Sequence, residues 1–149
     1  MKNCSILLVE DDADDVFFIS DALRRSGIDL PLDVANDGQA AIDFLIEARE
    51  RARLPEPVKL CLVLLDLNLP RKHGLEVLQW IRQESLWKTL VVLVLTSSTS
   101  ETDMNQAYLL GTNAYLIKPT DATKLRELGQ LVKQFWLEWN HVPPLATVR

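Results

Sequence analysis

The segment Leu60-Cys61-Leu62-Val63-Leu64-Leu65-Asp66 decides the fold class of this chain. Six apolar residues in a row are typical of a strand buried on both faces, as strands inside parallel sheets are. The run ends in an acid and continues into the turn Leu67-Asn68-Leu69-Pro70. An earlier run, Ser5-Ile6-Leu7-Leu8-Val9, ends in the same way in Glu10-Asp11-Asp12. The two segments therefore predict neighbouring strands that both end in carboxylates.

Outward from these strands, short apolar segments alternate with segments of helical periodicity. Further strands are predicted at 32–34, 90–95 and 114–117. Helices are predicted at 14–26, after Asn36-Asp37-Gly38, at 75–81, from Ser100 to Gly111, and over a last segment defined by Leu125, Leu128, Val132, Phe135 and Trp139. Strict alternation predicts one α/β domain, a doubly wound, five-stranded parallel sheet with helices on both faces. We expect this domain at 1–140 and a C-terminal tail at 141–149, with no output domain.

Composition excludes several classes of protein. The 149 residues are 48% apolar and 25% charged, as in ordinary soluble domains, and the net charge of −5 argues against nucleic-acid binding. The apolar stretches are too short to span a membrane, and we see no signal peptide. Cys4 and Cys61 stand at the starts of predicted strands and are expected to be free thiols. Cytoplasmic residence is therefore expected.

The carboxyl ends of parallel strands meet at one edge of the sheet, where sites form in open α/β folds. The side chains predicted at this edge are Glu10, Asp11, Asp66, Thr96, Ser97 and Lys118. Carboxylates so close together repel each other, and the cluster persists only where a cation neutralises it or where the repulsion serves chemistry. The combination predicts a metal-assisted phosphoryl acceptor.

Four segments and one glycine, five motifs in all, resemble in their order the receiver domain of two-component response regulators, over about residues 4–138. They are Ile6-Leu7-Leu8-Val9-Glu10-Asp11-Asp12, Leu64-Leu65-Asp66-Leu67-Asn68-Leu69-Pro70 with Gly74 after it, Leu95-Thr96-Ser97, and Tyr115-Leu116-Ile117-Lys118-Pro119. The resemblance implies the flavodoxin-like strand order 2-1-3-4-5. The Leu-Asn-Leu-Pro turn, the long loop around 49–57 and the segment Phe135-Trp136-Leu137-Glu138-Trp139 look most like single-domain regulators paired with bacterial phytochrome kinases.

The resemblance implies that Asp66 accepts a phosphoryl group from a phosphohistidine of a sensor histidine kinase. It also implies a Mg²⁺ ion held by Glu10, Asp11, Asp66 and the backbone carbonyl of Asn68, a donor set of oxygens that suits this ion. Many relatives carry Asp where this chain has Glu10, whose longer side chain favours contact through a metal-bound water.

Four more residues take roles from the resemblance. Lys118 would pair with Asp66 at rest and with the phosphoryl oxygens afterwards. Thr96 would donate its hydroxyl to the phosphoryl group, and Pro119 resembles the family's cis-proline, which would aim Lys118 into the site. Tyr115 would turn inward with the Thr96 hydroxyl, or would simply pack against the fourth helix.

The acids after the first strand also have structural interpretations. Asp14 and Asp15 are expected only to complement the dipole of the first helix. For Asp12, a role in the site and a role at the start of the helix remain equally open. The charged and proline-containing segment 49–57 is expected to face solvent.

The last helix carries more aromatic surface than one core-facing stripe can bury, in Phe135, Trp136 and Trp139. We expect a homodimer through the face of the fourth helix, fifth strand and last helix, with Phe135 and Trp136 in the interface. The alternative is that these rings pack on the tail Val142-Pro143-Pro144.

The alternative function is that of a haloacid-dehalogenase-type phosphatase with an aspartyl-phosphate intermediate. Its second acid would stand at Asn68, which cannot protonate a leaving group, and a cap insertion is missing. A flavin-binding protein fits less well, because the acids after the first strand would repel a phosphate. We therefore expect a signalling domain and not an enzyme.

Overall fold

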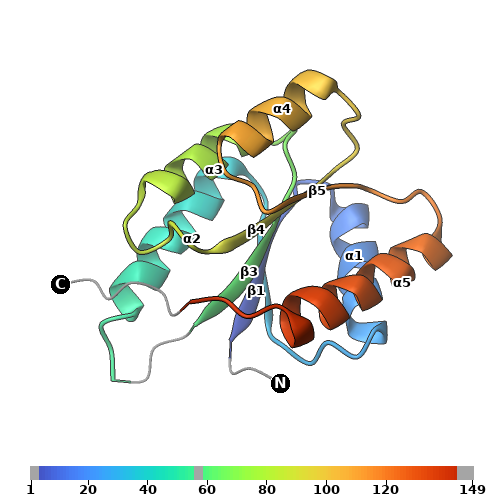
Figure 1. Ribbon diagram of the computed structural model, residues 1–149, viewed down its shortest axis with the longest axis horizontal. Helices are drawn as coiled ribbons and strands as arrows, with labels where there is room; N and C mark the ends of the chain where they lie inside the picture. Colours follow the sequence, from blue (N-terminus) through green and yellow to red (C-terminus); the bar gives the residue numbers. More distant parts are fainter. Residues whose placement is uncertain (1–3, 56–58, 144–149) are drawn as a thin grey trace.

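The computed structural model describes residues 4–55 and 59–143 (Figure 1). Five strands form one parallel sheet in the order β2-β1-β3-β4-β5, so the predicted topology is confirmed. The strands are β1 (Ser5–Val9), β2 (Leu32–Ala35), β3 (Leu60–Leu65), β4 (Val91–Thr96) and β5 (Ala114–Ile117).

Helices cover both faces of the sheet. They are α1 (Ala13–Arg25), α2 (Gly38–Arg51), α3 (Gly74–Gln83), α4 (Glu101–Leu109), α5 (Ala122–Leu131) and a π-helix, η1 (Val132–Trp139). Figure 1 shows α1 and α5 side by side on one face and α2, α3 and α4 on the other. The fold is therefore a three-layer α/β domain with the sheet in the middle.

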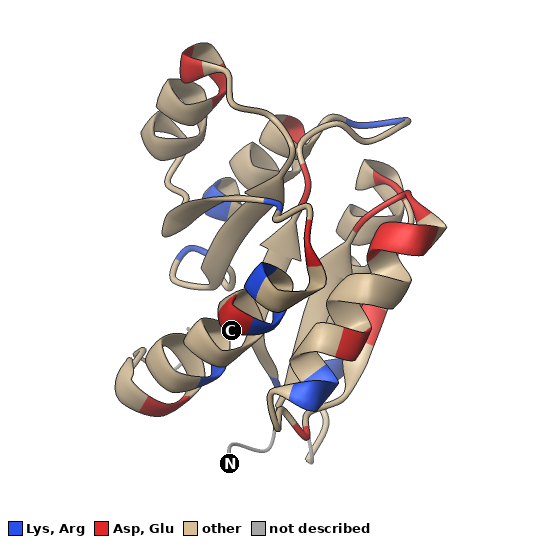
Figure 2. Ribbon diagram, turned by 90° about the vertical axis from the view of Figure 1, so that its right-hand side faces the viewer, with Lys and Arg blue, Asp and Glu red and all other residues tan. Residues whose placement is uncertain are grey.

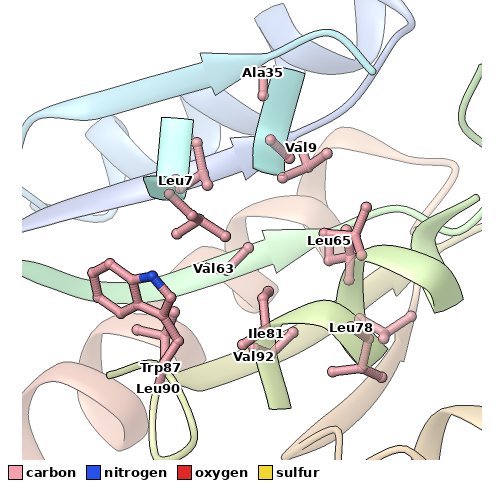
Figure 3. Close-up of a cluster of buried hydrophobic side chains, with 14 of the residues drawn as sticks. Leu7, Val9, Ala35, Val63, Leu65, Leu78, Ile81, Trp87, Leu90 and Val92 are labelled. Atoms are coloured by element: carbon pink, nitrogen blue, oxygen red, sulfur yellow. The ribbon is translucent and has the colours of Figure 1, made fainter. Parts of the chain in front are cut away.

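The central strands bury both of their faces. Along β3, Val63 and Leu65 point into the cluster under α2 and α3, while Leu62 and Leu64 point into the cluster under α1 and α5. Figure 3 shows the first cluster, in which Leu78 and Ile81 lie near Leu65 and Val92. Because both faces of β3 are buried, its sequence is a continuous run of apolar residues.

Four helices begin at a side chain that accepts a hydrogen bond from a backbone N–H three residues further on. These N-cap residues are Asp12 for α1, Asp37 for α2, Ser100 for α4 and Asp121 for α5. Short polar side chains satisfy N–H groups that a helix start leaves free. For Asp12 the structure shows the role at the start of the helix, with 3.0 Å from its Oδ1 to Asp15 N.

The end of the last helix differs from its predicted pattern. The helical spacing groups Trp139 with Val132, but Trp139 is 79% exposed, whereas Leu137 is only 6% exposed. The reason is the π-helical turn, in which Asn140 N donates to Phe135 O at 2.6 Å, five residues back. This wider turn brings Val132 and Leu137 to the same face.

Cys4 and Cys61 are joined in a disulfide, so the prediction of free thiols was wrong. They stand at the amino ends of β1 and β3, with 5.5 Å between their Cα atoms. The pairing shifts register between Ser5 and Ile6, so that Ser5 lies opposite Leu60 and Ile6 opposite Leu62. Neighbouring strands at this separation meet the geometric requirement for a disulfide.

Two predicted surface segments are only partly described. In the segment 49–57, α2 continues to Arg51, and residues 56–58 lie outside the described part. Val142 is 41% exposed, and the tail from residue 144 onward also lies outside it. Among the residues that the structure describes, none forms a helix long and apolar enough to cross a bilayer.

Candidate functional site

The site lies at the carboxyl edge of the sheet, and the sheet backbone holds its residues. Each of three site residues follows its strand directly yet still donates its N–H to a neighbouring strand. The three hydrogen bonds run from Glu10 N to Ala35 O (3.0 Å), from Asp66 N to Val9 O (3.0 Å) and from Lys118 N to Thr96 O (2.9 Å). Side chains placed in this way have little freedom of position.

Three carboxylates meet at this edge, as the strand ends predict. Glu10, Asp11 and Asp66 each offer an oxygen within 4.8 Å of the others. The side chains of Glu10 and Asp66 are buried, while Asp11 is exposed and leaves the cluster open on one side. Figure 2 shows that acidic residues gather where α1 begins, next to this edge. Three converging carboxylates form a donor set that fits a small divalent cation.

Lys118 balances this negative charge. Its Nζ lies 3.0 Å from Asp66 Oδ2 and 3.0 Å from Asp15 Oδ2, and it also forms an ion pair with Glu10. Burial alone would lower the pKa of the Lys118 ammonium, but the hydrogen bonds with Glu10, Asp15 and Asp66 outweigh burial and raise it. Lys118 is therefore a fixed positive charge.

Asp15 is the site residue that sequence reasoning missed. It was expected only to complement the helix dipole, yet its carboxylate contacts Lys118. A signal was present, because Asp15 stands four residues before the buried Ile19 and so shares the sheet-facing side of α1.

The Glu10 carboxyl is the most perturbed acid of the site. Burial raises the pKa of Glu10 to about 7, and the neighbouring charge of Asp66 acts in the same direction. The hydrogen bond with Lys118 and the backbone N–H of Asp12 oppose this rise. Without a bound cation, Glu10 thus holds a proton more readily than an ordinary glutamate does.

Asp66 is fixed by its own turn. Its Oδ1 accepts from Leu67 N at 2.7 Å, and its Oδ2 accepts from Lys118. Gly74 begins α3 so close to this turn that a Cβ there would lie 2.2 Å from the Asp66 carbonyl oxygen. A glycine is therefore required for α3 to start against the end of β3. The predicted ligand Asn68 lies in the same turn, with an exposed side chain.

Thr96 and Tyr115 lie on β4 and β5. Thr96 is fully buried at the end of β4, and its Oγ1 accepts from Ser98 N at 3.3 Å. Tyr115 is half-buried against the cluster that includes Ala107 of α4, and its hydroxyl donates to Ser98 O at 3.0 Å. Both side chains therefore contact the same residue of the β4–α4 loop.

The Lys118–Pro119 peptide bond is trans, so the prediction of a cis-proline at Pro119 was wrong. An X–Pro bond prefers trans by about 0.5–1 kcal/mol unless its surroundings demand otherwise. In this structure, the three carboxylates that surround Lys118 Nζ orient its side chain.

A surface groove of about 540 Å³ opens beside Lys118, between α1 and the start of α5. Its apolar lining includes Phe18, Ile19, Ala22 and Leu125, and its charged lining includes Asp15 and Arg126. Phe18 is 55% exposed, so much of its ring remains uncovered. The groove thus reaches the edge of the sheet at which Lys118 lies.

The motif resemblance is supported by comparison with known proteins. The family model for the response regulator receiver domain matches residues 6–130. The response regulator Rcp1 of Synechocystis sp. is 41% identical over 138 residues, which cover 93% of this chain and 92% of that protein.

Solved structures of response regulators superpose on this chain over most of its length. The phosphorylated cyanobacterial phytochrome response regulator RcpA superposes with a TM-score of 0.83 at 32% identity, covering 95% of this chain and 99% of that one. The Mn²⁺-bound form of Rcp1 superposes with a TM-score of 0.80 at 41% identity, covering 94% of this chain and 99% of that one. The bacteriophytochrome response regulator RtBRR superposes with a TM-score of 0.69 at 36% identity, covering 96% of this chain and 86% of that one.

Proposed function

The chain belongs to the response regulator receiver family, and from this premise we propose that Asp66 accepts a phosphoryl group from a sensor histidine kinase. The observation that carries the proposal is the meeting of Glu10, Asp11, Asp66 and Lys118 at one edge of the sheet. The phosphatase alternative is not supported, since the family is one of signalling domains and Asn68 cannot act as an acid.

In the proposed reaction, an Asp66 oxygen attacks the phosphorus of a phosphohistidine. The P–N bond breaks, an O–P bond forms, and the imidazole leaves. Because a carboxylate is a weak nucleophile, catalysis consists of alignment and charge neutralisation. Lys118, 3.0 Å from Asp66 Oδ2, would exchange this partner for a phosphoryl oxygen, and Thr96 would donate its hydroxyl to another.

Glu10, Asp11, Asp66 and the Asn68 carbonyl would hold a Mg²⁺ ion. When bound, this ion would offset the charge that the phosphoryl group adds beside three carboxylates. The oxygen-only donor set supports this, and the solved Rcp1 structure contains Mn²⁺, an ion that prefers similar ligands.

The proposal also names two partners. The kinase would bring its phosphohistidine to Asp66 along the groove between α1 and α5, which opens at the site. Because several relatives are phytochrome response regulators, we propose a bacteriophytochrome as the kinase.

We further propose a homodimer through α4, β5 and the α5–η1 helix. These elements expose large apolar side chains, namely Tyr108, Leu109, Ile117, Leu131, Phe135 and Trp139. Trp136 is half-buried and packs edge-to-face on Phe135, with 4.9 Å between ring centroids. Phe135 and the free part of the Trp136 ring would lie in the interface.

Phosphorylation of Asp66 tests the proposal. Incubation with acetyl phosphate and Mg²⁺ should raise the intact mass by one phosphoryl group, and Asp66→Asn should abolish the adduct. Asp29→Asn is the matched control, because Asp29 is an exposed residue of the loop between α1 and β2 and does not belong to the site. An unchanged mass in the parent protein, or an adduct that persists in Asp66→Asn, would refute the assignment.

A further inference from the structure

Ser98, in the loop between β4 and α4, contacts both predicted switch residues through its backbone. Its N–H donates to Thr96 Oγ1 at 3.3 Å, and its carbonyl oxygen accepts from the Tyr115 hydroxyl at 3.0 Å. Ser98 therefore lies between the residue that would contact the phosphoryl group and the aromatic residue on β5.

The Ser98 side chain makes a separate connection to α4. Its Oγ donates to Asp103 Oδ2 at 2.6 Å, a short hydrogen bond to a charged acceptor. Asp103 belongs to the first turn of α4, and its N–H donates to Ser100 Oγ at 3.3 Å. One residue thus joins the phosphorylation site, β5 and the start of a helix.

The helix at the other end of this connection is only weakly held. Ala107 is the single buried residue of α4, while Tyr108 and Leu109 are 57% and 80% exposed. A helix with so little buried surface moves at a small free-energy cost. A hydrogen bond from a hydroxyl to a charged carboxylate is stronger than one between neutral groups, so the Ser98–Asp103 bond can influence the position of such a helix.

We propose that Ser98 and Asp103 are positioning residues, whose hydrogen bond latches the β4–α4 loop to α4 and holds the resting conformation. A rotation that brings the Thr96 hydroxyl toward a phosphoryl group removes the acceptor of Ser98 N. The loop then shifts, the Tyr115 hydroxyl loses its partner, and the Ser98–Asp103 bond must break or carry α4 along. The strength of the latch sets the population of the signalling conformation before phosphorylation.

The test uses fluorotyrosine and ¹⁹F NMR. The chain has two tyrosines, so the fluorinated protein gives two resonances, which Tyr108→Phe assigns. The parent protein is measured before and after acetyl phosphate with Mg²⁺, and the two positions of the Tyr115 resonance define the resting and phosphorylated states.

Without phosphorylation, Ser98→Ala and Asp103→Ala should both move the Tyr115 resonance toward its phosphorylated position. The expected rise in the ratio of signalling to resting conformation is about tenfold, the factor that corresponds to about 1.4 kcal/mol. Ser98→Thr keeps the hydroxyl and should restore the parent position.

Ser100→Ala is the matched control. It removes the N-cap of the same helix but leaves the Ser98–Asp103 contact, so it should destabilise α4 without moving the Tyr115 resonance. An unmoved resonance in both Ser98→Ala and Asp103→Ala, or an equal shift in Ser100→Ala, would overturn the latch.

The proposed latch rests on the proposed function of Asp66, and different results of the experiment would refute each proposal. A parent protein that gains no phosphoryl mass refutes the acceptor role of Asp66 and the latch with it. A parent that gains the mass while the variants leave Tyr115 unmoved refutes the latch alone.

Discussion

Among the residues of the site, Glu10 has a charge that depends most on its surroundings. Its pKa of about 7 lies above the ordinary value of 4.5, so between these pH values the folded protein binds a proton that the unfolded chain has lost. Stability should therefore fall as pH rises through this window, by up to about 1.4 kcal/mol per pH unit from this group.

The measurement is urea unfolding at a series of pH values in the presence of a chelator. The parent should lose stability relative to Glu10→Gln as pH rises from 4.5 to 7, because glutamine does not titrate. Curves that run parallel in the two proteins would contradict the buried-carboxyl explanation. Mg²⁺ should reduce the loss, since it favours the ionised carboxylate.

The site was largely predictable because strand direction alone determines which side chains share an edge. Glu10, Asp11, Asp66 and Lys118 come together for this reason. Asp15 comes from a helix, and its contact with Lys118 depends on how α1 is rotated against the sheet. Such a rotation follows from packing, which strand periodicity does not describe.

At the scale of elements, the groove between α1 and α5 offers a test of kinase docking. Phe18 lines the groove, while its neighbour Phe17 does not and is 63% exposed. Phe18→Ala should slow phosphoryl transfer from an autophosphorylated bacteriophytochrome kinase by about tenfold or more, as loss of an aromatic contact residue does.

Phe17→Ala is the control and should transfer at the parent rate. Both variants should react normally with acetyl phosphate, which is small enough to need no docking surface. Equal transfer from the kinase to Phe18→Ala and Phe17→Ala would place the docking surface elsewhere.

The π-helix makes a second prediction at this scale. Leu137→Ala should lower the free energy of unfolding by about 2–5 kcal/mol, because it removes a buried side chain. Trp139→Ala should change it by less than about 0.5 kcal/mol, because the ring is 79% exposed. Chemical denaturation of both variants checks this order, and the reverse order would mean that the helix continues in α-helical register.

Sequence periodicity alone does not give that order, for a physical reason. A spacing of three and four residues puts Phe135 and Trp139 on one stripe of the helix, together with Val132. The π-helical turns of η1, whose last hydrogen bond reaches five residues back from Asn140 to Phe135, change the register and place Leu137 on the buried face. No residue type marks this turn in advance.

At the scale of the whole molecule, the mass of the protein in solution tests the proposed dimer. Sedimentation at tens of micromolar should give a mass above one protomer, and Phe135→Asp should shift the equilibrium toward the monomer. Phe17→Asp adds the same charge to α1, at a similarly exposed position, and should leave the mass unchanged. A monomeric parent protein, with and without acetyl phosphate, would rule out the dimer.

The disulfide also acts on the whole molecule, because it closes a loop between residues 57 apart in sequence. Reduction should lower the free energy of unfolding by about 2–4 kcal/mol. Urea unfolding with and without a phosphine reductant measures the effect, and Cys61→Ala should be insensitive to the reductant. Two titratable thiols in the folded, unreduced protein would show that the bond does not form.

The topology was predictable from the alternation of strands and helices, since parallel strands need helical crossovers. The disulfide was not, because Cys4 and Cys61 at the starts of two apolar strands were interpreted as small buried hydrophobic residues with free thiols. The contact between Cys4 and Cys61 depends on the pairing and register of β1 and β3, which the folded sheet shows.

The order of the site residues along the chain has a consequence for biosynthesis. A ribosome produces Glu10, Asp11 and Asp66 well before Lys118, the last member of the cluster. A nascent polypeptide that has already paired β1 with β3 therefore carries three crowded anions without their ammonium counterion. Until the fifth strand emerges from the exit tunnel, cellular divalent ions are the available means of relieving that repulsion.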